Sequence, residues 1–386
     1  MKQKDFTGKT AVIVCHDAMF GPPHELRDFL LSHDIKKLLF IGHRNRSMHD
    51  NAILSSYMEL YVHGKKIQKR NALKTSFLPE WLAYIVDSLL TVIWTVLTRG
   101  KIDYFIGLGN MNAFCGLFIR AIGKIDKVVY YIIDYIPDRF PSAVMNTLYH
   151  RLDYWCSEFS DMTWNYADKM IQARSTRWHK EFPNQYVIPN GIRLRKYMDI
   201  RKASLSREII YIGTLREEQG IQLVIDALPD IIRSVPRVHF SLIGKGEYRV
   251  PLERMVAEKH LGNYVTFLGY IEDPILADRR LAKAAVGVAT YTPTNGMITF
   301  TEPGKVKRYF ACGLPVIMTN VGPIAEEATK AGCCIVVPYK AKKLAEAVVS
   351  LFRNPKKIEK MREHAIQYVK SFEWDTVFSR AFEKLM

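Results

Sequence analysis

Short runs of apolar residues alternate with longer amphipathic stretches along almost the whole chain. Within many of the longer stretches, apolar side chains recur every three or four residues, which predicts helices with one buried face. One such set consists of Val144, Leu148, Leu152, Trp155 and Phe159. The short runs predict β-strands at Thr10–Val14, Lys37–Ile41, Asp103–Gly107, Lys127–Ile133, Tyr186–Ile188, Glu208–Ile212, Arg237–Ile243, Ala285–Thr290, Pro315–Thr319 and Cys334–Val337. Alternating strands and helices predict an α/β fold in which helices cover both faces of parallel sheets.

This alternation is interrupted once, near the middle of the chain. Asn190-Gly191 marks a turn, and the surrounding segment Pro189–Arg207 is polar and basic. Because the alternation restarts afterwards, we expect two domains, at residues 1–190 and 205–370. The chain end, residues 371–386, has the spacing of a short helix. Its apolar side consists of Trp374, Val377, Phe378, Ala381 and Phe382.

The composition is that of a globular protein, since 48% of the 386 residues are hydrophobic and 24% are charged. This excludes a disordered or collagen-like chain. We expect no signal peptide, because the first residues are polar and the apolar run after them is short. The six cysteines show no metal-ligand spacing, which predicts reduced thiols in a cytoplasmic protein. The formal net charge of +16 predicts an anionic partner: a phosphorylated ligand, a membrane surface or a nucleic acid.

A series of motifs in the second half carries a family resemblance. The motifs are VIPNGI at Val187–Ile192, YIGTLREEQG at Tyr211–Gly220, LIGKGE at Leu242–Glu247, VTFLGYI at Val265–Ile271, EPGKVKRYFACGLPVI at Glu302–Ile317 and VGPIAEEA at Val321–Ala328. In order and spacing they resemble the retaining glycosyltransferases of the GT-B fold, and are similar to glycosyltransferase family four. FEWDTV at Phe372–Val377 resembles the closing helix of that family, which crosses back onto the first domain.

The resemblance implies two Rossmann-like, doubly wound domains that face a cleft. It also implies transfer of a hexose-type sugar from a UDP- or GDP-sugar, held by the second domain, to a lipid-linked or polysaccharide acceptor, held mainly by the first. Such transfer is retaining and requires no metal and no cofactor beyond the nucleotide-sugar substrate. An epimerase of the same fold matches the motifs less well.

The segment Pro303-Gly304-Lys305 is the main candidate for binding the donor diphosphate. A helical run starts here, so its first amide hydrogens and the positive end of its dipole are presented to a ligand. Gly304 permits close approach to the backbone, and Lys305 adds a full charge, which together suit a diphosphate. The alternative is an ordinary capped helix in a solvated loop.

Other donor-binding candidates lie at strand ends. Gly213 and Gly244 each end a strand and leave room for a ligand. By resemblance, the loop of Tyr270 and Ile271 lies against the nucleotide base, although Tyr270 packed under the sheet edge is an equal alternative. Gly21, in a Gly-Pro-Pro-His sequence, and Val306, beside Lys305, are also assigned to donor binding by resemblance.

Three positions depart from the family pattern. Thr214 and Gln219 stand where the family has an arginine and a lysine that reach the donor phosphates. Arg216 lies nearby and is a candidate to replace the lost charge. Arg308 stands where the family has a glutamate that accepts hydrogen bonds from the donor ribose, and a guanidinium only donates them.

The earlier glutamate of the family falls on Phe300, whereas Glu302 lies two residues later. Glu302 is a candidate catalytic residue that contacts the transferred sugar or polarises the donor. The alternative is an exposed residue favoured by the helix dipole. These departures leave two outcomes. The chain is an active transferase with an altered donor pocket, or a catalytically silent GT-B subunit that binds a partner glycosyltransferase or a glycan.

Polar residues near strand ends of the first domain are candidates for the acceptor side. Asp134 follows the strand Lys127–Ile133, and we expect it to orient an acceptor hydroxyl as a catalytic residue. A loop salt bridge with Arg139 is the alternative. Weaker candidates are His16, His24 and Asn110, since isolated histidines are more often structural than catalytic.

A basic cluster precedes the most apolar stretch of the chain. It consists of Lys65, Lys66, Lys69, Arg70 and Lys74. Trp81–Leu97 follows, and only Asp87, Thr91 and Thr95 interrupt its apolar character.

The apolar stretch is a little shorter than the ~20 residues of a transmembrane helix. Together with the cations it predicts peripheral attachment to the anionic inner face of a membrane. A buried helix beside a solvated loop is the alternative. No nucleic-acid partner is expected, because no RNP, KH or helix-turn-helix pattern is present.

Overall fold

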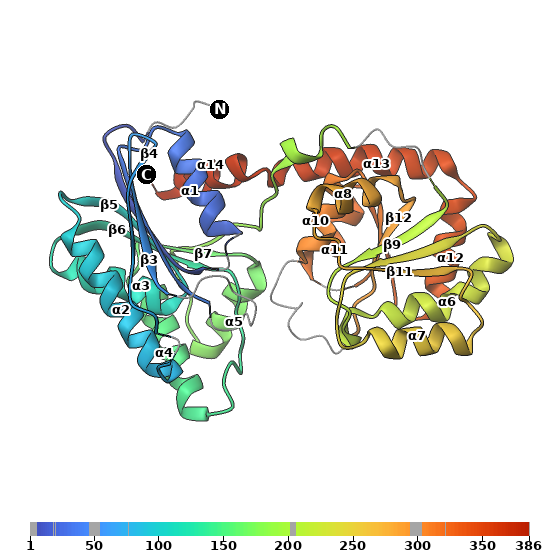
Figure 1. Ribbon diagram of the computed structural model, residues 1–386, viewed down its shortest axis with the longest axis horizontal. Helices are drawn as coiled ribbons and strands as arrows, with labels where there is room; N and C mark the ends of the chain where they lie inside the picture. Colours follow the sequence, from blue (N-terminus) through green and yellow to red (C-terminus); the bar gives the residue numbers. More distant parts are fainter. Residues whose placement is uncertain are drawn as a thin grey trace. The chain divides into compact units, whose positions relative to one another are not determined.

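The computed structural model describes residues 6–17, 19, 21–45, 55–75, 77–200, 206–293, 303–320 and 322–385. The chain forms two compact units (Figure 1). Unit 1 comprises Met1–Gly191 together with Trp374–Met386, and unit 2 comprises Ile192–Glu373. The first division follows the Asn190-Gly191 turn directly. Each unit is built around its own sheet.

The sheet of unit 1 has its strands in the order β4-β3-β2-β1-β5-β6-β7-β8. The strands are β1 (Thr10–Asp17), β2 (Lys37–Arg44), β3 (Tyr57–Val62), β4 (Lys65–Asn71), β5 (Ile102–Leu108), β6 (Ile125–Ile132), β7 (Met162–Asn165) and β8 (Gln185–Val187). β3 and β4 run antiparallel to their neighbours, whereas the remaining pairs are parallel. The central strands β1 and β5 carry almost only buried side chains, so they form the middle of the core.

Helices cover both faces of this sheet, with α2, α3 and α4 on one face and α1 and α14 on the other (Figure 1). The helices of unit 1 are α1 (Pro22–Ser32), α2 (Glu80–Leu97), α3 (Asn110–Ala121), α4 (Ala143–Phe159), α5 (Asp168–Trp178) and α14 (Trp374–Leu385). α14 belongs to unit 1 because its aromatic side chains pack there. The ring centroid of Phe382 lies 4.9 Å from that of Phe6 and 5.4 Å from that of Trp164.

Unit 2 contains a parallel sheet in the order β11-β10-β9-β12-β13-β14. Its strands are β9 (Glu208–Ile212), β10 (His239–Ile243), β11 (Val265–Gly269), β12 (Val286–Ala289), β13 (Val316–Thr319) and β14 (Cys334–Val337). Its α-helices are α6 (Ile221–Ser234), α7 (Arg249–Glu258), α8 (Pro274–Lys283), α10 (Gly304–Ala311), α11 (Pro323–Lys330), α12 (Ala341–Phe352) and α13 (Pro355–Val369). Short 3₁₀ helices are η1 (Leu194–Tyr197), η2 (Glu217–Gln219) and η3 (Lys370–Phe372).

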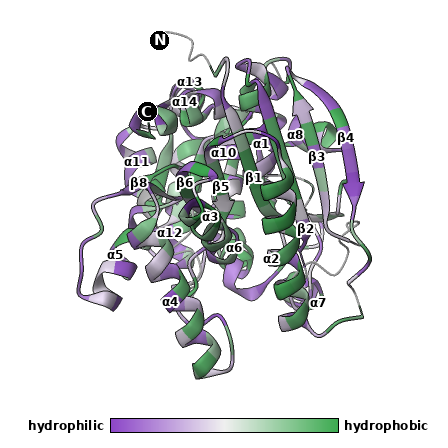
Figure 2. Ribbon diagram, turned by 90° about the vertical axis from the view of Figure 1, so that its left-hand side faces the viewer, coloured by the Kyte–Doolittle hydropathy of each residue, from purple (hydrophilic) through white to green (hydrophobic). Residues whose placement is uncertain are grey.

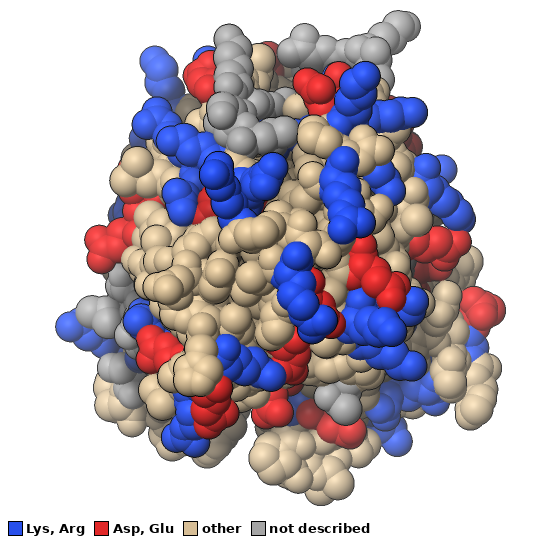
Figure 3. Space-filling model, turned by 90° about the vertical axis from the view of Figure 1, so that its right-hand side faces the viewer, with Lys and Arg blue, Asp and Glu red and all other residues tan. Residues whose placement is uncertain are grey.

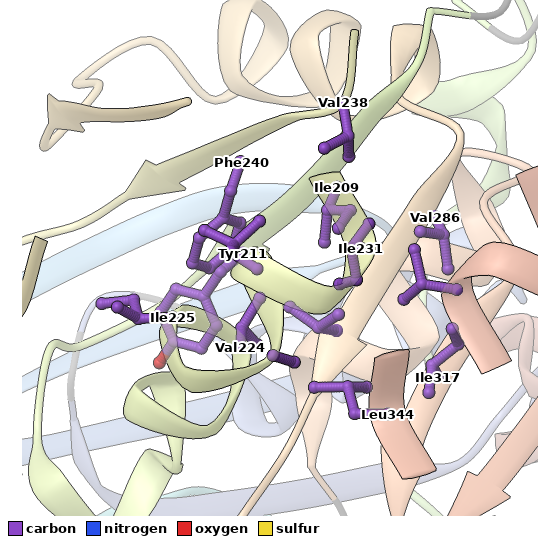
Figure 4. Close-up of a cluster of buried hydrophobic side chains, with 14 of the residues drawn as sticks. Ile209, Tyr211, Val224, Ile225, Ile231, Val238, Phe240, Val286, Ile317 and Leu344 are labelled. Carbon is purple, nitrogen blue, oxygen red and sulfur yellow. The ribbon is translucent and has the colours of Figure 1, made fainter. Parts of the chain in front are cut away.

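One core of unit 2 lies between this sheet and helices α6 and α12 (Figure 4). Ile209 and Tyr211 of β9 lie in a fully buried cluster with Val224 of α6 and Leu344 of α12. The ring of Tyr211 belongs to this core, but its hydroxyl donates to the carbonyl oxygen of Thr214 at 2.8 Å. Tyr211 therefore connects the core to the loop that follows β9.

Every strand predicted from the apolar runs is present, and each starts within two residues of its predicted start. The ranges predicted from the apolar runs leave out β3, β4, β7 and β11. β4 carries exposed lysines because it is an edge strand, where charged side chains discourage pairing with other chains. β7 is only four residues long, which is too short for a clear periodic signal.

The predicted helix at α4 is present, but the prediction that its apolar side is buried is wrong. The exposed fractions are 70% for Val144, 53% for Leu148, 40% for Trp155 and 57% for Phe159. The opposite side of the helix is buried because Asp153 binds the fully buried guanidinium of Arg174, with Nε donating to Oδ2 at 2.9 Å. A buried ion pair requires its partners to stay in place, so the polar side fixes the orientation of α4.

Candidate functional site

Two glycine loops form the edge of a pocket at the carboxyl ends of β9 and β10. Gly213 follows β9 and Gly244 follows β10, and both have a φ of 145°. A Cβ on Gly244 would lie 1.9 Å from the carbonyl oxygen of Gly213, so the two loops leave no room for a side chain. The amide of Gly213 donates to Ile243 at 3.0 Å, and that of Gly244 donates to Gly269 at 2.8 Å. These bonds hold both loops against the neighbouring strand ends.

A pocket of about 300 Å³ opens at these loops, between the ends of β9, β10 and β11 and helices α8 and α10. Predicted donor-binding residues that line it are Gly213, Thr214, Gly244, Tyr270, Ile271 and Arg308. Tyr270 is 64% exposed, so its ring is not packed under the sheet edge. Its centroid lies 5.5 Å from Nζ of Lys245.

Sequence reasoning missed Lys245, Glu272 and Pro274, which also line the pocket. Each lies within three residues of a predicted residue. Their position in loops that follow predicted strands could have identified them, because neighbouring residues of a strand-end loop face the same crevice.

Lys305 reaches from α10 to the loop of Gly213. Its Nζ donates to the hydroxyl of Tyr211 at 2.9 Å and to Oε1 of Gln219 at 2.5 Å. The same nitrogen lies 4.1 Å from the ring centroid of Tyr211 and 5.0 Å from that of Tyr291, as in a cation–π contact. A Cβ on Gly213 would come within 3.1 Å of Nζ. The nitrogen therefore lies directly beside a loop that lines the pocket.

Burial lowers the pKa of the Lys305 ammonium from 10.5 to about 7, and in the described part of the chain no carboxylate counteracts this effect. Burial disfavours the charged form, whereas an anion placed next to the nitrogen would favour it. Lys305 is thus suited to an anionic ligand.

Arg308 lines the same pocket but already has an acidic partner. Its Nε donates to Oδ1 of Asp278 at 2.5 Å, and its Nη2 donates to the carbonyl oxygen of Pro274 at 3.3 Å. Burial raises the pKa of Asp278, and the guanidinium of Arg308 opposes this rise. The ion pair joins α10 to α8. Position 308 presents a guanidinium to the pocket, whereas the resemblance implies a carboxylate there.

Comparison with known proteins connects this geometry to a family. Residues 206–354 match the family described as glycosyl transferases group 1. Unit 2 carries a group 1 glycosyl transferase domain. The chain as a whole has the GT-B fold. It aligns over 98% of its length with 99% of Anabaena HepE, solved in complex with UDP, with a TM-score of 0.64 and 15% identity.

Two curated relatives align with parts of the chain. Glycogen synthase of Mycobacterium tuberculosis (strain CDC 1551 / Oshkosh) is 25% identical over 244 residues, which are 61% of this chain and 56% of that protein. A GDP-mannose-dependent monoacylated alpha-(1-6)-phosphatidylinositol monomannoside mannosyltransferase of Corynebacterium glutamicum is 26% identical over 143 residues, which are 36% of this chain and 35% of that protein. The chain thus spans a little over half of the first relative and about a third of the second.

Within the group 1 domain, the departure at Gln219 contacts Lys305 and the departure at Thr214 lines the pocket. Thr214 is exposed at the pocket, and the side-chain oxygen of Gln219 accepts a hydrogen bond from the Lys305 nitrogen. The Lys305 nitrogen therefore lies 2.5 Å from the side chain of residue 219, the position at which the resemblance implies a lysine. Arg216 is exposed and precedes η2, and it is not one of the residues lining the pocket.

The remaining donor-binding candidates do not join the pocket. The side chain of Val306 is fully buried in the core of unit 2, so a ligand cannot contact it. Gly304 is the exposed first residue of α10. Gly21 belongs to unit 1, where it precedes α1 with a φ of 91°. Glu302 lies outside the described residues.

On the acceptor side, His24 belongs to a hydrogen-bonded cluster around Asp17. His24 Nε2 lies 2.7 Å from Oδ1 of Asp17, and the hydroxyl of Tyr57 donates to Oδ2. Burial would raise the pKa of Asp17, but the bonds from His24 and Tyr57 outweigh it and hold this pKa below its ordinary value. The cluster therefore keeps an ionised carboxylate at the end of β1.

His16 is the preceding residue of β1, so its side chain points to the opposite face of the sheet. Its Nε2 lies 3.9 Å from Oδ2 of Asp87, and its ring centroid lies 5.2 Å from that of Tyr84. His16 and His24 therefore belong to separate clusters.

Asn110 and Asp134 have local partners. Asn110 Nδ2 donates to the carbonyl oxygen of Tyr149 at 3.0 Å, and its Oδ1 accepts from the amide of Met111 at 2.8 Å, which fastens α3 to α4. Asp134 is half exposed and pairs with Arg139 at 3.4 Å. The contact is the loop salt bridge that the sequence left open as an alternative.

Metal-ligating residue types do not gather in the described ranges, where no group of three or more His, Cys, Asp or Glu side chains could hold an ion. All six cysteines are free and buried.

Proposed function

We propose that this chain is a glycosyltransferase that moves a sugar from a UDP- or GDP-sugar to a lipid-linked or polysaccharide acceptor, with retention and without a metal ion. The group 1 domain supports the reaction class. The UDP complex of HepE and the name of the Corynebacterium relative support a nucleotide-diphosphate donor. That relative's phosphatidylinositol-based name also supports a lipid-linked acceptor. Asp134 and Glu302 remain our proposed catalytic residues.

The observation that carries the proposal is the position of Lys305 beside the pocket loop of Gly213. Gly213 and Gly244 line the pocket with backbone alone, so a donor diphosphate can approach the main chain closely there. The nearby nitrogen gains a proton when an anion binds. In sugar transfer the diphosphate leaves with negative charge, and groups already aimed at developing charge speed such a step.

The first test is a thermal-shift screen of UDP, GDP, ADP and dTDP, each with and without EDTA. We expect UDP or GDP to raise the melting temperature of unit 2 in both conditions. Lys305→Met should weaken binding by about 10- to 100-fold, because it removes a charge-assisted contact worth about 1.5–3 kcal/mol. The control is Lys342→Met, at an exposed position of α12, which should bind normally. If none of the four nucleotides stabilises the protein, the transferase proposal fails.

A second candidate function is a catalytically silent GT-B subunit, which the Arg308–Asp278 ion pair favours. The pair occupies the position at which the resemblance implies a carboxylate that accepts hydrogen bonds from the ribose. Nucleotide release from the best-binding sugar donor separates the two functions, since a silent subunit binds the donor but releases no nucleotide.

A charge-swapped variant tests the position itself. Arg308→Glu combined with Asp278→Arg keeps an ion pair and returns a carboxylate to position 308. If Arg308 contacts the ribose, this double variant should change donor affinity, whereas the single variant Asp278→Asn should mainly lower stability. Unchanged affinity in the double variant places residue 308 away from the donor.

A further inference from the structure

Helix α2 of unit 1 turns its polar side inward. Asp87, Thr91 and Thr95 are all buried. Oδ1 of Asp87 accepts from the hydroxyl of Ser56 at 2.6 Å, and Oγ1 of Thr91 lies 2.7 Å from Nε2 of His43. These contacts bind the helix to β2 and to the segment before β3, so α2 lies along the surface of unit 1.

The outward side of α2 is apolar over its whole length. Side chains at four-residue spacing point outward, and their exposed fractions are 61% for Trp81, 45% for Ile85, 56% for Leu89, 49% for Ile93 and 70% for Leu97. A surface helix of a globular domain normally buries such a stripe. By length and composition α2 is even apolar enough to cross a membrane, and only 22% of it is buried. Figure 2 shows this helix in green on the side that faces the viewer.

The neighbouring helices extend this apolar surface. α3 contacts both α2 and α4. Phe118 of α3 is 57% exposed, and Ile122, which directly follows this helix, is 60% exposed. The rings of Phe114 on α3 and Trp155 on α4 stack at a centroid distance of 6.0 Å. We call the outward apolar side chains of α2, α3 and α4 the apolar face. α4 contributes the side chains that the sequence pattern assigned to a buried core.

Cations adjoin the apolar face along the chain. β4 exposes Lys65, Lys66, Lys69 and Arg70, and Lys74 follows in the loop that leads to α2. Lys66 and Lys69 share Glu59, at 2.8 and 3.5 Å. In the same loop, Leu73 is 90% exposed and Phe77 is 79% exposed. Positive charge beside exposed aliphatic and aromatic side chains complements a bilayer with anionic headgroups.

We infer that the apolar face is a membrane-docking surface, which inserts into the boundary between headgroups and acyl chains while the cations of β4 and Lys74 bind anionic headgroups. The stripe is long and offers almost no hydrogen-bonding groups, and Trp81 stands at its end, where aromatic residues favour the membrane interface. Protein interfaces combine an apolar centre with a polar rim and direct hydrogen bonds. The inference does not depend on the proposed sugar transfer.

Vesicle flotation of the full chain tests this surface. We expect the protein to float with vesicles of phosphatidylcholine and phosphatidylglycerol at low salt, and to float much less with phosphatidylcholine alone. Leu89→Glu/Ile93→Glu should lower the bound fraction at least tenfold. The matched control is Val250→Glu/Met198→Glu, which places the same two charges on unit 2 at side chains that are 62% and 63% exposed, and it should bind like the natural chain.

Quenching by brominated lipids distinguishes insertion from charge attraction. We expect lipid bromine to quench the tryptophan fluorescence of the bound protein, and Trp81→Phe combined with Trp155→Phe, which removes both tryptophans of the apolar face, to abolish most of this quenching. Two outcomes overturn the inference. In one, the protein binds vesicles but Leu89→Glu/Ile93→Glu has no effect, so that the cations act alone. In the other, it ignores anionic vesicles and the same variant instead dissociates an oligomer in sedimentation, so that a second copy covers the face.

Discussion

Lys305 lies between two tyrosine rings with a pKa of about 7, compared with 10.5 for an ordinary lysine. Between these values the unfolded chain binds a proton that the folded chain does not. The free energy of unfolding should therefore rise with pH across this window, because stability increases with pH wherever the unfolded state holds more protons. Below pH 7 the destabilising effect of the buried charge is fully present.

The same side chain predicts proton uptake on nucleotide binding. At pH 8 the free protein holds Lys305 mostly neutral, and a bound diphosphate should restore its charge. We expect each bound nucleotide to take up a fraction of a proton, and affinity to fall as the pH rises above 7. Calorimetry in buffers of different ionisation enthalpy measures this uptake. Lys305→Met should abolish it and Lys342→Met should not. Equal uptake by both variants would assign the proton to another group.

The extent to which single site residues can be predicted depends on how far apart their partners lie in sequence. Gly213 and Gly244 are recognisable because each directly follows an apolar run. The contact between Lys305 and Gln219 joins residues 86 positions apart, and the pair of Arg308 and Asp278 joins residues 30 positions apart. No local pattern encodes such contacts, because the packing of α10 against the loops of unit 2 creates them.

Among the elements, α2 should lose stability when its polar side is changed and should tolerate changes on its apolar side. An ordinary amphipathic helix shows the reverse. Leu89→Gln changes an exposed side chain, so we expect a change in stability within about 0.5 kcal/mol. Thr91→Val changes volume little but removes the buried contact with His43, and should cost about 1–3 kcal/mol. Urea unfolding followed by circular dichroism compares the two. If Leu89→Gln loses much stability and Thr91→Val loses none, the apolar side of α2 is the buried one.

The two glycine loops make a second prediction about elements. Gly244→Ala would place a Cβ 1.9 Å from the oxygen of Gly213 and add the strain of a positive φ, about 1–3 kcal/mol. We expect lower stability and weaker nucleotide binding, because the loops must separate. Gly262→Ala is the control, since nothing lies within 4 Å of its Cβ, and it should change stability by less than about 0.5 kcal/mol. Thermal unfolding with and without nucleotide compares both variants.

The elements show what periodicity can and cannot predict. The spacing of apolar residues predicts α2 and α4 as helices, because it records the 3.6-residue repeat. It does not record which side faces the sheet, and in both helices buried polar contacts decide this. β4 is missed for a related reason, because an exposed edge strand has no buried face to set an alternating pattern.

At the scale of the molecule, the excess of positive charge does not by itself identify a partner. Figure 3 shows lysine and arginine side chains spread over one face, with acidic side chains among them. A net charge of +16 therefore predicts attraction to anions in general. The exposed cations of β4 in unit 1 and the half-buried Lys305 of unit 2 give that attraction two separate locations.

Two separate cores predict two unfolding transitions. Phe382 is fully buried in unit 1, where α14 packs against Phe6, and Phe240 is fully buried in the core of unit 2. Each Phe→Ala change should cost about 3–5 kcal/mol. Scanning calorimetry measures both transition temperatures. Phe382→Ala should lower only that of unit 1, which nucleotide does not change. Phe240→Ala should lower only that of unit 2, which nucleotide raises. Because the pocket residues all come from unit 2, Phe382→Ala should keep the nucleotide-induced shift. If both transitions move together in either variant, the units unfold as one and α14 couples them.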